Sequence, residues 1–294
     1  MAEQHTATLR RFNRTYTQRV GALDDSYLGL GWPLGASRLI FEIGEAGTTA
    51  RELRERLDLD SGYLSRLLRR LTRGGVVEVV PDPDDRRRRL VTLTPAGRSV
   101  RRDLDRRSEE RAASLIAPLT DRQRDRLADA LATADLLVRA ATVHLRTVPP
   151  TDPAAVAAVG QYVAELDRRF PAGFDPGDAT ASDSVAMSPP TGVFVVATSD
   201  GEPVACGGVQ QIGPEVGEIK RMWVHPDWRG AGLGARMLAH LEDRARGLGH
   251  RRVQLDTNGS LVEAIALYQR AGYRAVERYN DNPYAEAFFA KDLG

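Results

Sequence analysis

The chain has 294 residues, of which 42% are hydrophobic and 28% charged, enough for about two globular domains with separate cores. No apolar run reaches the ~18 residues that a membrane-spanning helix needs, and the polar, charged N-terminus is not typical of a signal peptide. The single cysteine, Cys206, excludes intrachain disulfides and zinc ribbons. The composition therefore predicts a soluble, cytoplasmic, two-domain protein with no metal centre.

The net charge of +1 hides an uneven distribution. Residues 1–152 carry a formal charge of +5, and residues 153–294 carry −4. The segment 61–102 alone holds 11 arginines against 4 acidic residues. Nearly all basic residues are arginines, which favours GC-rich codon usage as the main cause of that bias. Only the clustering within 61–102 therefore indicates a nucleic-acid-binding surface.

The first half of the chain predicts helices followed by one β-hairpin. Thr49 and Glu52 form a capping box at the start of a third helix, and leucines at helical spacing mark the buried face of a fourth. A Pro- and Asp-rich run over 81–85 is typical of a hairpin turn. The expected elements are helices over 9–30, 33–43, from Thr49, 61–73, from Thr94 and 120–145, and strands over 76–80 and 90–93.

The second half predicts an α+β domain. A Pro-rich segment over 147–153 marks a linker or the domain entry, so the expected domains are residues 1–147 and 148–294. A strand–helix–strand order over 218–255 predicts a parallel βαβ crossover. The expected elements are helices over 154–170, 232–248 and 261–271, and strands over 193–198, 204–210, 218–224, 253–255, 273–278 and 285–292.

The fourth helix exposes an arginine-rich face, because its leucines occupy the buried side. Such a helix fits the DNA major groove, where Arg66 is expected to read guanine. Ser65 and Arg69 or Arg70 are expected to hold phosphates. The four arginines at 86–89, at the hairpin tip, suit a narrow minor groove. The alternative is that these arginines are only solvated.

The segment from the hairpin tip onward resembles the wing of the MarR family of winged-helix regulators. The similarity to this family extends across about residues 5–145. The segment has the pattern D-x-R-x-x-x-V-x-L-T-x-x-G from Asp85 to Gly97. The resemblance implies a mainly α winged helix-turn-helix in which Asp85 orients Arg87 into the minor groove. It also implies a homodimer through the first, fifth and sixth helices. The expected DNA contacts are Ser61, Tyr63, Ser65, Arg66, Arg69, Arg70, Asp85, Arg86, Arg87 and Arg88.

A glycine-rich run over 229–234 lies between a predicted strand and a predicted helix. Backbone N–H groups of such a run can bind a pyrophosphate. Rossmann and P-loop sites share this logic, but the chain has no GK[ST] and no acidic residue at the ribose-reading spacing.

The second half of the chain, over about 153–294, resembles the GNAT N-acetyltransferases. The resemblance rests on the run R-G-x-G-x-G after V-x-P and on segment 266–273. The combination resembles the MarR–GNAT fusion regulators. It implies an α+β acyltransferase fold with a central mixed sheet and acetyl-CoA as cofactor. The implied cofactor-binding residues are Met222, Trp223, Val224, Arg229, Gly230, Ala231, Gly232, Leu233, Gly234, Ala235, Asn258 and Tyr268.

The resemblance also implies catalytic roles. Because an acceptor amine is protonated at neutral pH, a base is needed, and Glu218 occupies the position of the family's glutamate. Tyr268 matches the acid that protonates the departing thiolate, and backbone N–H groups over 222–224 are expected to stabilise the oxyanion. Alternatively, Glu218 is a structural carboxylate paired with Lys220 or Arg221, and Tyr268 only packs under the cofactor.

The acceptor site is expected near the first helix of the second domain and before the last strand. Arg168 or Arg169 would hold a carboxylate, and Glu165 or Asp281 an amine, which suits a small zwitterion. Alternatively, the Asn/Asp-rich segment is a turn that satisfies its own hydrogen bonds. Cys206 is expected to be a buried strand residue. The candidate acceptor residues are Tyr162, Glu165, Arg168, Arg169, Phe170, Tyr279, Asn280 and Asp281.

Together these features predict a DNA-binding transcriptional regulator fused to an acetyl-CoA-dependent N-acetyltransferase that acts on a small-molecule or protein amine. The expected partners are a double-stranded DNA operator, acetyl-CoA, the amine acceptor and a second copy of the chain. Two alternatives remain. The second domain could sense acetyl-CoA or a metabolite without turnover, or the winged helix could serve only for dimerisation.

Overall fold

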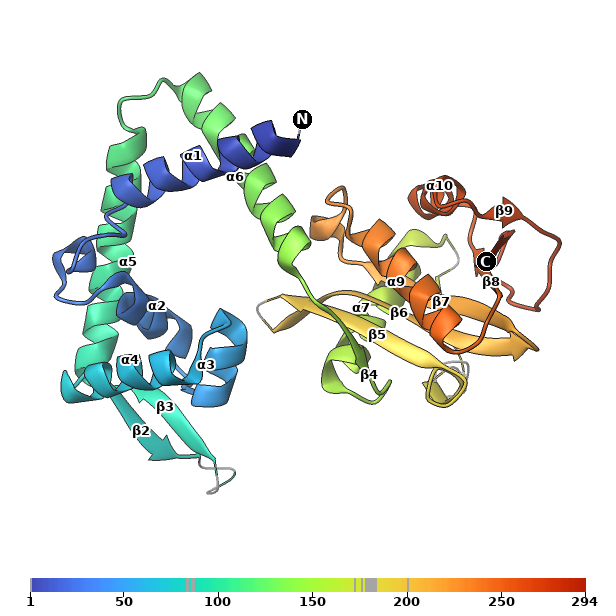
Figure 1. The fold of residues 1–294 in the computed structure, drawn as a ribbon, viewed down its shortest axis with the longest axis horizontal. Coiled ribbons are helices and arrows are strands. Elements are labelled where there is room, and N and C mark those ends of the chain that lie inside the picture. Colours follow the sequence, from blue (N-terminus) through green and yellow to red (C-terminus); the bar gives the residue numbers. More distant parts are fainter. Residues whose placement is uncertain are drawn as a thin grey trace. The chain divides into compact units, whose positions relative to one another are not determined.

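A computed structural model describes residues 2–82, 85, 88–171, 173–175, 177, 184–199 and 201–294 (Figure 1). Its contacts divide the chain into two compact units, residues 1–128 and 129–294. The division lies inside helix α6 (Asp121–Thr142), so the second unit begins before the domain boundary expected near residue 147. Within the described residues, no helix is long and apolar enough to span a membrane.

The first unit is a helical domain with a small antiparallel sheet, in the order β1-β3-β2. This arrangement is the winged helix-turn-helix that the sequence predicted. Its elements are α1 (Ala2–Arg19), η1 (Tyr27–Gly29), α2 (Leu34–Ile43), β1 (Thr48–Thr49), α3 (Ala50–Leu57), α4 (Ser61–Arg73), β2 (Val77–Pro81), β3 (Arg89–Leu93) and α5 (Pro95–Ile116).

Side-chain caps define where these helices start. The Thr49 hydroxyl accepts from the Glu52 backbone N–H at 3.1 Å, and the Glu52 carboxylate accepts from Thr49 N at 2.9 Å, which confirms the capping box. Asp60 caps α4 with a single bond, in which its Oδ1 accepts from the Tyr63 backbone N–H at 2.9 Å. The leucine face of α4 is buried in the core of the unit, so its polar face is presented to solvent.

The first helix ends earlier than expected. α1 ends at Arg19, and Gly21 follows with a φ of +74°, a left-handed conformation that stops a helix. The chain then forms the short η1 instead of continuing a helix to Leu30. Strand β1 was not predicted, because two residues become a strand only by pairing with β3, about 40 residues away along the chain.

The second unit is built on a seven-stranded mixed sheet with the order β4-β5-β6-β7-β8-β10-β9. Strands β7 and β8 are parallel, which confirms the βαβ crossover, and the other neighbouring pairs are antiparallel. The elements are β4 (Leu145–Val148), α7 (Pro153–Arg169), β5 (Val193–Ser199), β6 (Glu202–Gly213), β7 (Val216–Val224), η2 (Pro226–Trp228), α9 (Leu233–Gly247), β8 (Arg252–Thr257), α10 (Val262–Arg270), β9 (Arg274–Ala275) and β10 (Ala287–Asp292).

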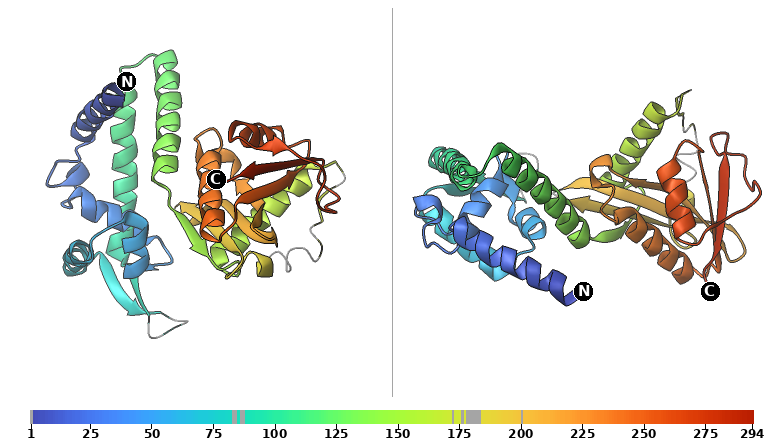
Figure 2. Two further views of the ribbon diagram at one scale, coloured as in Figure 1. Left: turned by 45° about the vertical axis from the view of Figure 1, so that its right-hand side comes forward. Right: turned by 90° about the horizontal axis from the view of Figure 1, so that it is seen from above.

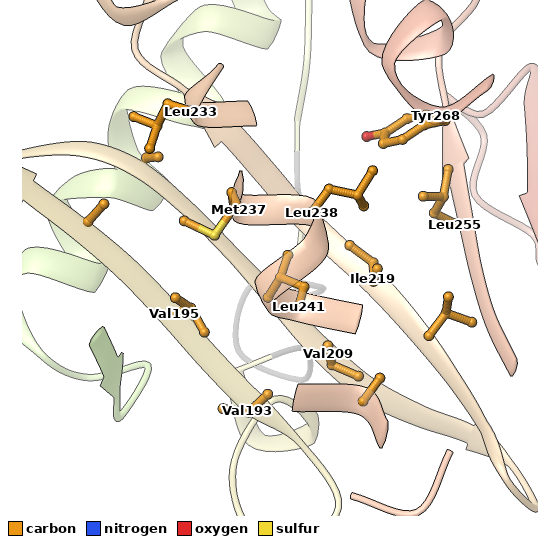
Figure 3. Packing of buried hydrophobic residues seen from close by; sticks show 14 of the residues in the cluster. Val193, Val195, Val209, Ile219, Leu233, Met237, Leu238, Leu241, Leu255 and Tyr268 are labelled. Atoms are coloured by element: carbon orange, nitrogen blue, oxygen red, sulfur yellow. The ribbon is translucent and has the colours of Figure 1, made fainter. Parts of the chain in front are cut away.

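Helices α7 and α9 cover opposite faces of this sheet (Figure 2). Alternate residues of β5 point to opposite faces. Val193 and Val195 pack in the cluster of α9, whereas Phe194 and Val196 pack in the cluster of α7. Figure 3 shows Leu233, Met237, Leu238 and Leu241 of α9 packed over valines and an isoleucine of the central strands.

The segment expected as a linker is partly a strand. Residues 145–148 form β4, which pairs antiparallel with β5 at the edge of the sheet. The last turns of α6 also belong to this unit. Arg236 of α9 donates to the carbonyl oxygens of Ala140 and Val143, and the Arg139 guanidinium lies 4.5 Å from the centre of the Trp228 ring. α6 therefore ends on the core of the second unit.

The parallel strands β7 and β8 separate after their first three residue pairs. Pairing runs from Val216 with Arg252 to Glu218 with Gln254 and then stops. On its other side, β7 has a register shift against β6 near Gly207, where Arg221 adopts a φ of +54°. Such a bulge redirects the strand. Beyond Glu218, β7 and β8 no longer pair, so residues 219–224 of β7 border a gap in the sheet.

Candidate functional site

Two adjoining cavities open at this gap. One, of about 480 Å³, includes Arg229, Gly230, Gly232 and Gly234 in its lining and is called the glycine-loop cavity. The other, of about 390 Å³, includes Phe170, Phe174 and Tyr284 and is called the aromatic cavity. Both volumes are within the range of small-molecule sites. The residues that line both cavities are Tyr162, Leu166, Met222, Leu261, Ala264 and Tyr268.

Tyr268 of α10 lies where the two cavities meet. It is only 6% exposed, and its ring contacts those of Tyr273 and Phe289, with centroids 5.9 and 6.2 Å away. Burial, with a contribution from the negative charge of Asp256, raises the pKa of Tyr268 to about 12. The phenol therefore stays protonated at every physiological pH and can donate a hydrogen bond to a group at the junction.

The glycine-rich loop begins helix α9. Gly230 and Gly232 both have a φ of +80°, a conformation that favours glycine, and a Cβ at either position would meet nothing within 4 Å. The backbone is therefore open to a ligand beside the N-terminus of a 15-residue helix. The side chain of Leu233, another expected cofactor residue, is buried in the core, and Ala231 packs against that core.

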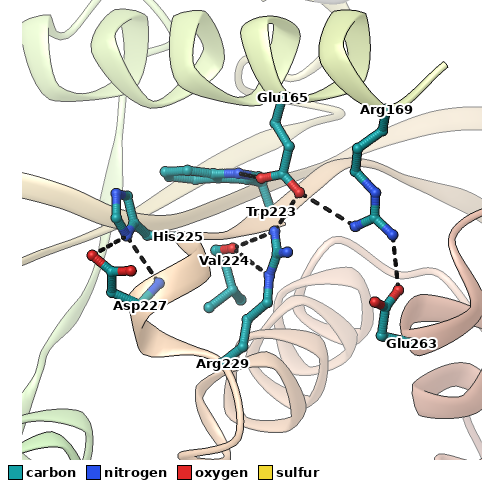
Figure 4. Close-up of polar contacts among 8 residues, drawn as sticks. All are labelled: Glu165, Arg169, Trp223, Val224, His225, Asp227, Arg229 and Glu263. Atoms are coloured by element: carbon teal, nitrogen blue, oxygen red, sulfur yellow. Dashed lines mark hydrogen bonds and ion pairs between the residues drawn. The ribbon is translucent and has the colours of Figure 1, made fainter. Parts of the chain in front are cut away.

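Arg229 is held by an ionic network at the glycine-loop cavity (Figure 4). Its guanidinium donates to Val224 O at 3.0 and 3.1 Å and to the Glu165 carboxylate at 2.5 Å. Glu165 also accepts from Trp223 Nε1 at 2.8 Å. Burial alone would raise the pKa of Glu165, but the hydrogen bonds from Arg229 and Trp223 outweigh it and lower this pKa. Arg169 joins the network at 3.4 Å.

Glu218 is buried and lines neither cavity. It is 3% exposed, and its Oε2 accepts from Gln210 Nε2 at 2.7 Å and lies 3.7 Å from Lys220 Nζ. Its Oε1 accepts from the Tyr279 hydroxyl at 3.0 Å and from Asn280 Nδ2 at 3.1 Å. Burial and the charge of Glu218 raise the pKa of Tyr279 far above its usual value. A direct catalytic role for Glu218 stays a prediction.

The aromatic cavity has one wall of stacked rings. Phe170 and Tyr284 stack with centroids 5.9 Å apart, and Phe174 lies 4.7 Å from Tyr284. Tyr284 also ties two segments together, because its hydroxyl accepts from the Asp175 backbone N–H at 3.0 Å. Polar groups of the lining come from β7 and β8, including Arg221 and Asp256. The cavity thus offers an apolar surface and charged groups to one ligand.

The residues expected to bind the acceptor are divided among several places. Tyr162, Phe170 and Asn280 line the aromatic cavity, whereas Glu165 and Arg169 line the glycine-loop cavity. Among the described residues, Arg168, Tyr279 and Asp281 line neither, and Arg168 and Asp281 are exposed.

Other expected cofactor residues also fall on two sides. Met222, Trp223, Val224 and Ala235 line the glycine-loop cavity. Asn258 lies in the aromatic cavity instead, where its Nδ2 donates to Tyr284 O at 2.9 Å and its Oδ1 accepts from Ser260 N at 2.9 Å.

The residues of the aromatic cavity that the sequence analysis missed include Phe174, Arg221 and Asp256. Asp256 accepts from Asn280 and Asn282, and the only sequence signal for it is a carboxylate near the end of a predicted strand. Cys206 is fully buried on β6 and donates to Arg221 O at 3.3 Å. Burial raises its pKa to about 12, as expected for a strand residue that is not a nucleophile.

The expected DNA-contacting residues of α4 lie on two sides of the helix. Tyr63 stacks with Arg66, whose guanidinium is 5.8 Å from the ring centre, and Arg70 lies 5.9 Å from Trp32 on the same side. The other side, with Ser61, Ser65 and Arg69, lines a groove of about 770 Å³ between α3, α4 and β2.

The hairpin tip is described only in part. Arg86 and Arg87 lie outside the described residues. Arg88 forms ion pairs with Glu52 at 3.1 Å and with Asp82 at 3.7 Å, and its backbone N–H donates to Asp85 O at 2.8 Å. Arg88 therefore links the hairpin to the start of α3.

Within the described residues, no group of three or more His, Cys, Asp or Glu side chains is arranged to hold a metal ion. Two family models match the chain. The Acetyltransferase (GNAT) family matches residues 161–273, and the MarR family matches residues 28–88.

Individual proteins match as well. The chain is 36% identical over 118 residues to IAA acetyltransferase of Azospirillum brasilense, covering 40% of this chain and 76% of that protein. It is 33% identical over 134 residues to N-alpha-acetyltransferase RimI of Mycobacterium tuberculosis, covering 44% of this chain and 82% of that protein. A GNAT-family acetyltransferase structure from Staphylococcus aureus, at 13% identity and a TM-score of 0.46, covers 51% of this chain and 100% of that chain.

Proposed function

Because the chain belongs to the GNAT acetyltransferase family and also carries a MarR family domain, we propose that it is a DNA-binding regulator that acetylates an amine with acetyl-CoA. The second unit is an N-acetyltransferase, and enzymes of this family generally use acetyl-CoA. The observation that carries the proposal is the junction of two cavities at Tyr268, one beside a helix N-terminus and one lined by aromatic and charged residues.

The residues of the glycine-loop cavity fit acetyl-CoA. The open backbone at Gly230 and Gly232 and the N-terminus of α9 suit a pyrophosphate, and Arg229 and Arg270 supply positive charge nearby. When bound, the cofactor supplies an acetyl group activated as a thioester. Tyr268 would donate a proton toward the sulfur, and the backbone at the bulge near Met222 would stabilise the oxyanion.

The cofactor site is tested with Gly232→Glu. A carboxylate at the start of α9 repels a pyrophosphate, so calorimetry is expected to show loss of acetyl-CoA binding. Gly247→Glu is the matched control at the other end of α9, where a Cβ also meets nothing within 4 Å. Equal affinity of both folded variants would contradict the assignment of the loop.

Turnover separates the enzyme from a sensor. The amine-dependent release of CoA thiol is measured with a panel of amines. The proposal expects release with at least one of them. A protein that binds acetyl-CoA tightly but releases thiol with none would support the sensor alternative.

DNA binding is proposed for the first unit. It is supported by the exposed polar face of α4, which carries four arginines, and by the excess positive charge of residues 61–102. Arg66→Ala is expected to weaken binding to a selected operator duplex by about 1–3 kcal/mol, measured by fluorescence anisotropy over a range of salt concentrations. Arg251→Ala, an exposed arginine of the second unit, is the control. A full-length protein that binds no duplex would favour a winged helix used only for dimerisation.

A homodimer through the first, fifth and sixth helices is also proposed. It is supported by exposed apolar side chains on these helices, for example Leu9, which is 60% exposed, and Phe12, Ile116 and Leu137. Light scattering coupled to size-exclusion chromatography measures the mass, and a mass near 32 kDa at micromolar concentration would contradict the dimer.

A further inference from the structure

The aromatic cavity contains a carboxylate that the sequence motifs do not indicate. Asp256, near the end of β8, is half-buried and lines this cavity. Its Oδ2 accepts from Asn280 Nδ2 at 2.6 Å, and its Oδ1 accepts from Asn282 Nδ2 at 3.2 Å. An ionised carboxylate has about four acceptor positions. The two amides therefore orient Asp256 and leave acceptor positions for a ligand.

Asp256 is also close to the junction of the cavities. After burial, which is the main cause, its negative charge raises the pKa values of Tyr268 and Tyr279. Asp256 and Tyr268 both line the aromatic cavity, and Tyr268 also lines the glycine-loop cavity that the thioester would enter.

The charges around Asp256 are nearly balanced. Lys220 and Arg221 reach the cavity from β7, and Asp175 reaches it from the segment after α7. Lys220 is paired with Glu218 at 3.7 Å. Among the described residues, the other titratable groups that line the cavity are Tyr162 from α7, Tyr268 from α10 and Tyr284 before β10. Within this described lining a polycation would find no surplus of negative charge, whereas a single ammonium would find Asp256.

The aromatic residues of the lining select the body of the ligand. Phe170, Phe174 and Tyr284 form a cluster with centroid distances of 4.7 to 5.9 Å, and all three line the cavity. Aromatic rings pack best against other rings and also attract a cation. A volume of about 390 Å³ admits a compact molecule and excludes a large one.

Resting on the function proposed above, we propose that Asp256 binds the acceptor's ammonium and takes its proton, and that the acceptor is a compact monoamine with an aromatic body. The first nitrogen proton passes to Asp256, which later releases it to solvent. The nitrogen lone pair forms the new C–N bond, and the C–S bond breaks with its electron pair on sulfur. Tyr268 gives its proton to sulfur and regains one from the nitrogen, leaving an amide, a thiol and one released proton.

Glu218 then has a positioning role. One amide nitrogen, Asn280 Nδ2, donates to both Glu218 at 3.1 Å and Asp256 at 2.6 Å. Glu218 therefore holds Asn280, and Asn280 orients Asp256. Direct proton transfer to Glu218 is not required, since Glu218 does not line the cavity.

The first experiment measures binding without turnover. Calorimetry compares 2-phenylethylamine with the uncharged 2-phenylethanol, using full-length wild type, Asp256→Asn and the control Asp243→Asn, an exposed carboxylate on α9. The amine is expected to bind wild type and Asp243→Asn at least tenfold more tightly than the alcohol. Asp256→Asn is expected to lose this preference while keeping wild-type affinity for acetyl-CoA, which shows that the variant is folded. An unchanged preference in Asp256→Asn would overturn the proposal.

The second experiment measures thiol release with 2-phenylethylamine, ethylamine, spermidine and a tetrapeptide. The aromatic amine is expected to have at least a tenfold higher kcat/KM than each of the others. Asp256→Asn is expected to lower kcat/KM by ~10²–10⁴ near neutral pH, with a smaller deficit toward pH 10, where more of the amine is unprotonated. A preference for spermidine or the peptide would overturn the inference but leave the acetyltransferase standing. Absence of acetyl-CoA binding would instead contradict the proposed function.

Discussion

Replacement of Tyr268 by phenylalanine tests the centre of the proposed active site. The substitution keeps the ring that packs against Tyr273 and Phe289 and removes only the hydroxyl. The Tyr268 pKa of about 12 lies well above the ~8.5 of an ordinary thiol, so complete proton transfer would be uphill by about 5 kcal/mol. The phenol therefore contributes mainly a hydrogen bond to the developing thiolate. Its proton passes to the sulfur only as the nitrogen supplies another proton to the phenol oxygen.

A hydrogen bond to a charged group contributes about 1.5–3 kcal/mol, so kcat is expected to fall roughly 10- to 150-fold. Acetyl-CoA affinity, measured by calorimetry, is expected to stay within about twofold of wild type. Because the raised pKa keeps the phenol protonated, wild type is expected to lose no activity through deprotonation of Tyr268 below about pH 12. Tyr273→Phe is the control, because Tyr273 is buried in the same cluster but lines neither cavity. Equal turnover of Tyr268→Phe and wild type would refute the acid role.

Two further predictions concern stability and reactivity. Arg236→Ala removes the hydrogen bonds to the carbonyl oxygens of Ala140 and Val143 at the end of α6. Since this guanidinium is partly exposed, the free energy of unfolding is expected to fall by about 2 kcal/mol, which lowers Tm by roughly 4–8 °C. Arg244→Ala on the same helix is the control, and equal Tm values would contradict the docking of α6. Cys206 is expected to resist thiol reagents at pH 8 until the protein unfolds, and rapid labelling of the native protein would contradict its burial. The pKa of Cys206 rises from 9.0 to about 12 on folding. Its contribution to the free energy of unfolding is therefore present below pH 9 and is lost between pH 9 and 12. Cys206→Ala should reduce this alkaline loss of stability.

Features encoded within a few neighbouring residues could be predicted from the sequence. The capping box at Thr49, the leucine face of α4 and the glycine loop before α9 each depend on contacts within one or two turns of chain. The parallel crossover also follows from the order of its elements, because a strand, a helix and a second strand of suitable length have one common solution. Local patterning was therefore sufficient for both fold classes, whereas the expected cofactor site stays a prediction.

The tertiary structure decided where the remaining side chains lie. Glu165 and Arg169 are one helical turn apart, so they share a face of α7, and packing brought that face to Arg229 and the glycine loop. Strand β4 exists only through its pairing with β5.

Asp256 illustrates the same limit at the proposed acceptor site. It meets Asn280 and Asn282 because β8 pairs antiparallel with β10, and the segment before β10 then runs past the end of β8. Such neighbours are separated by more than twenty residues of chain. Their meeting depends on strand register, which is set by packing over the whole sheet and not by any local pattern.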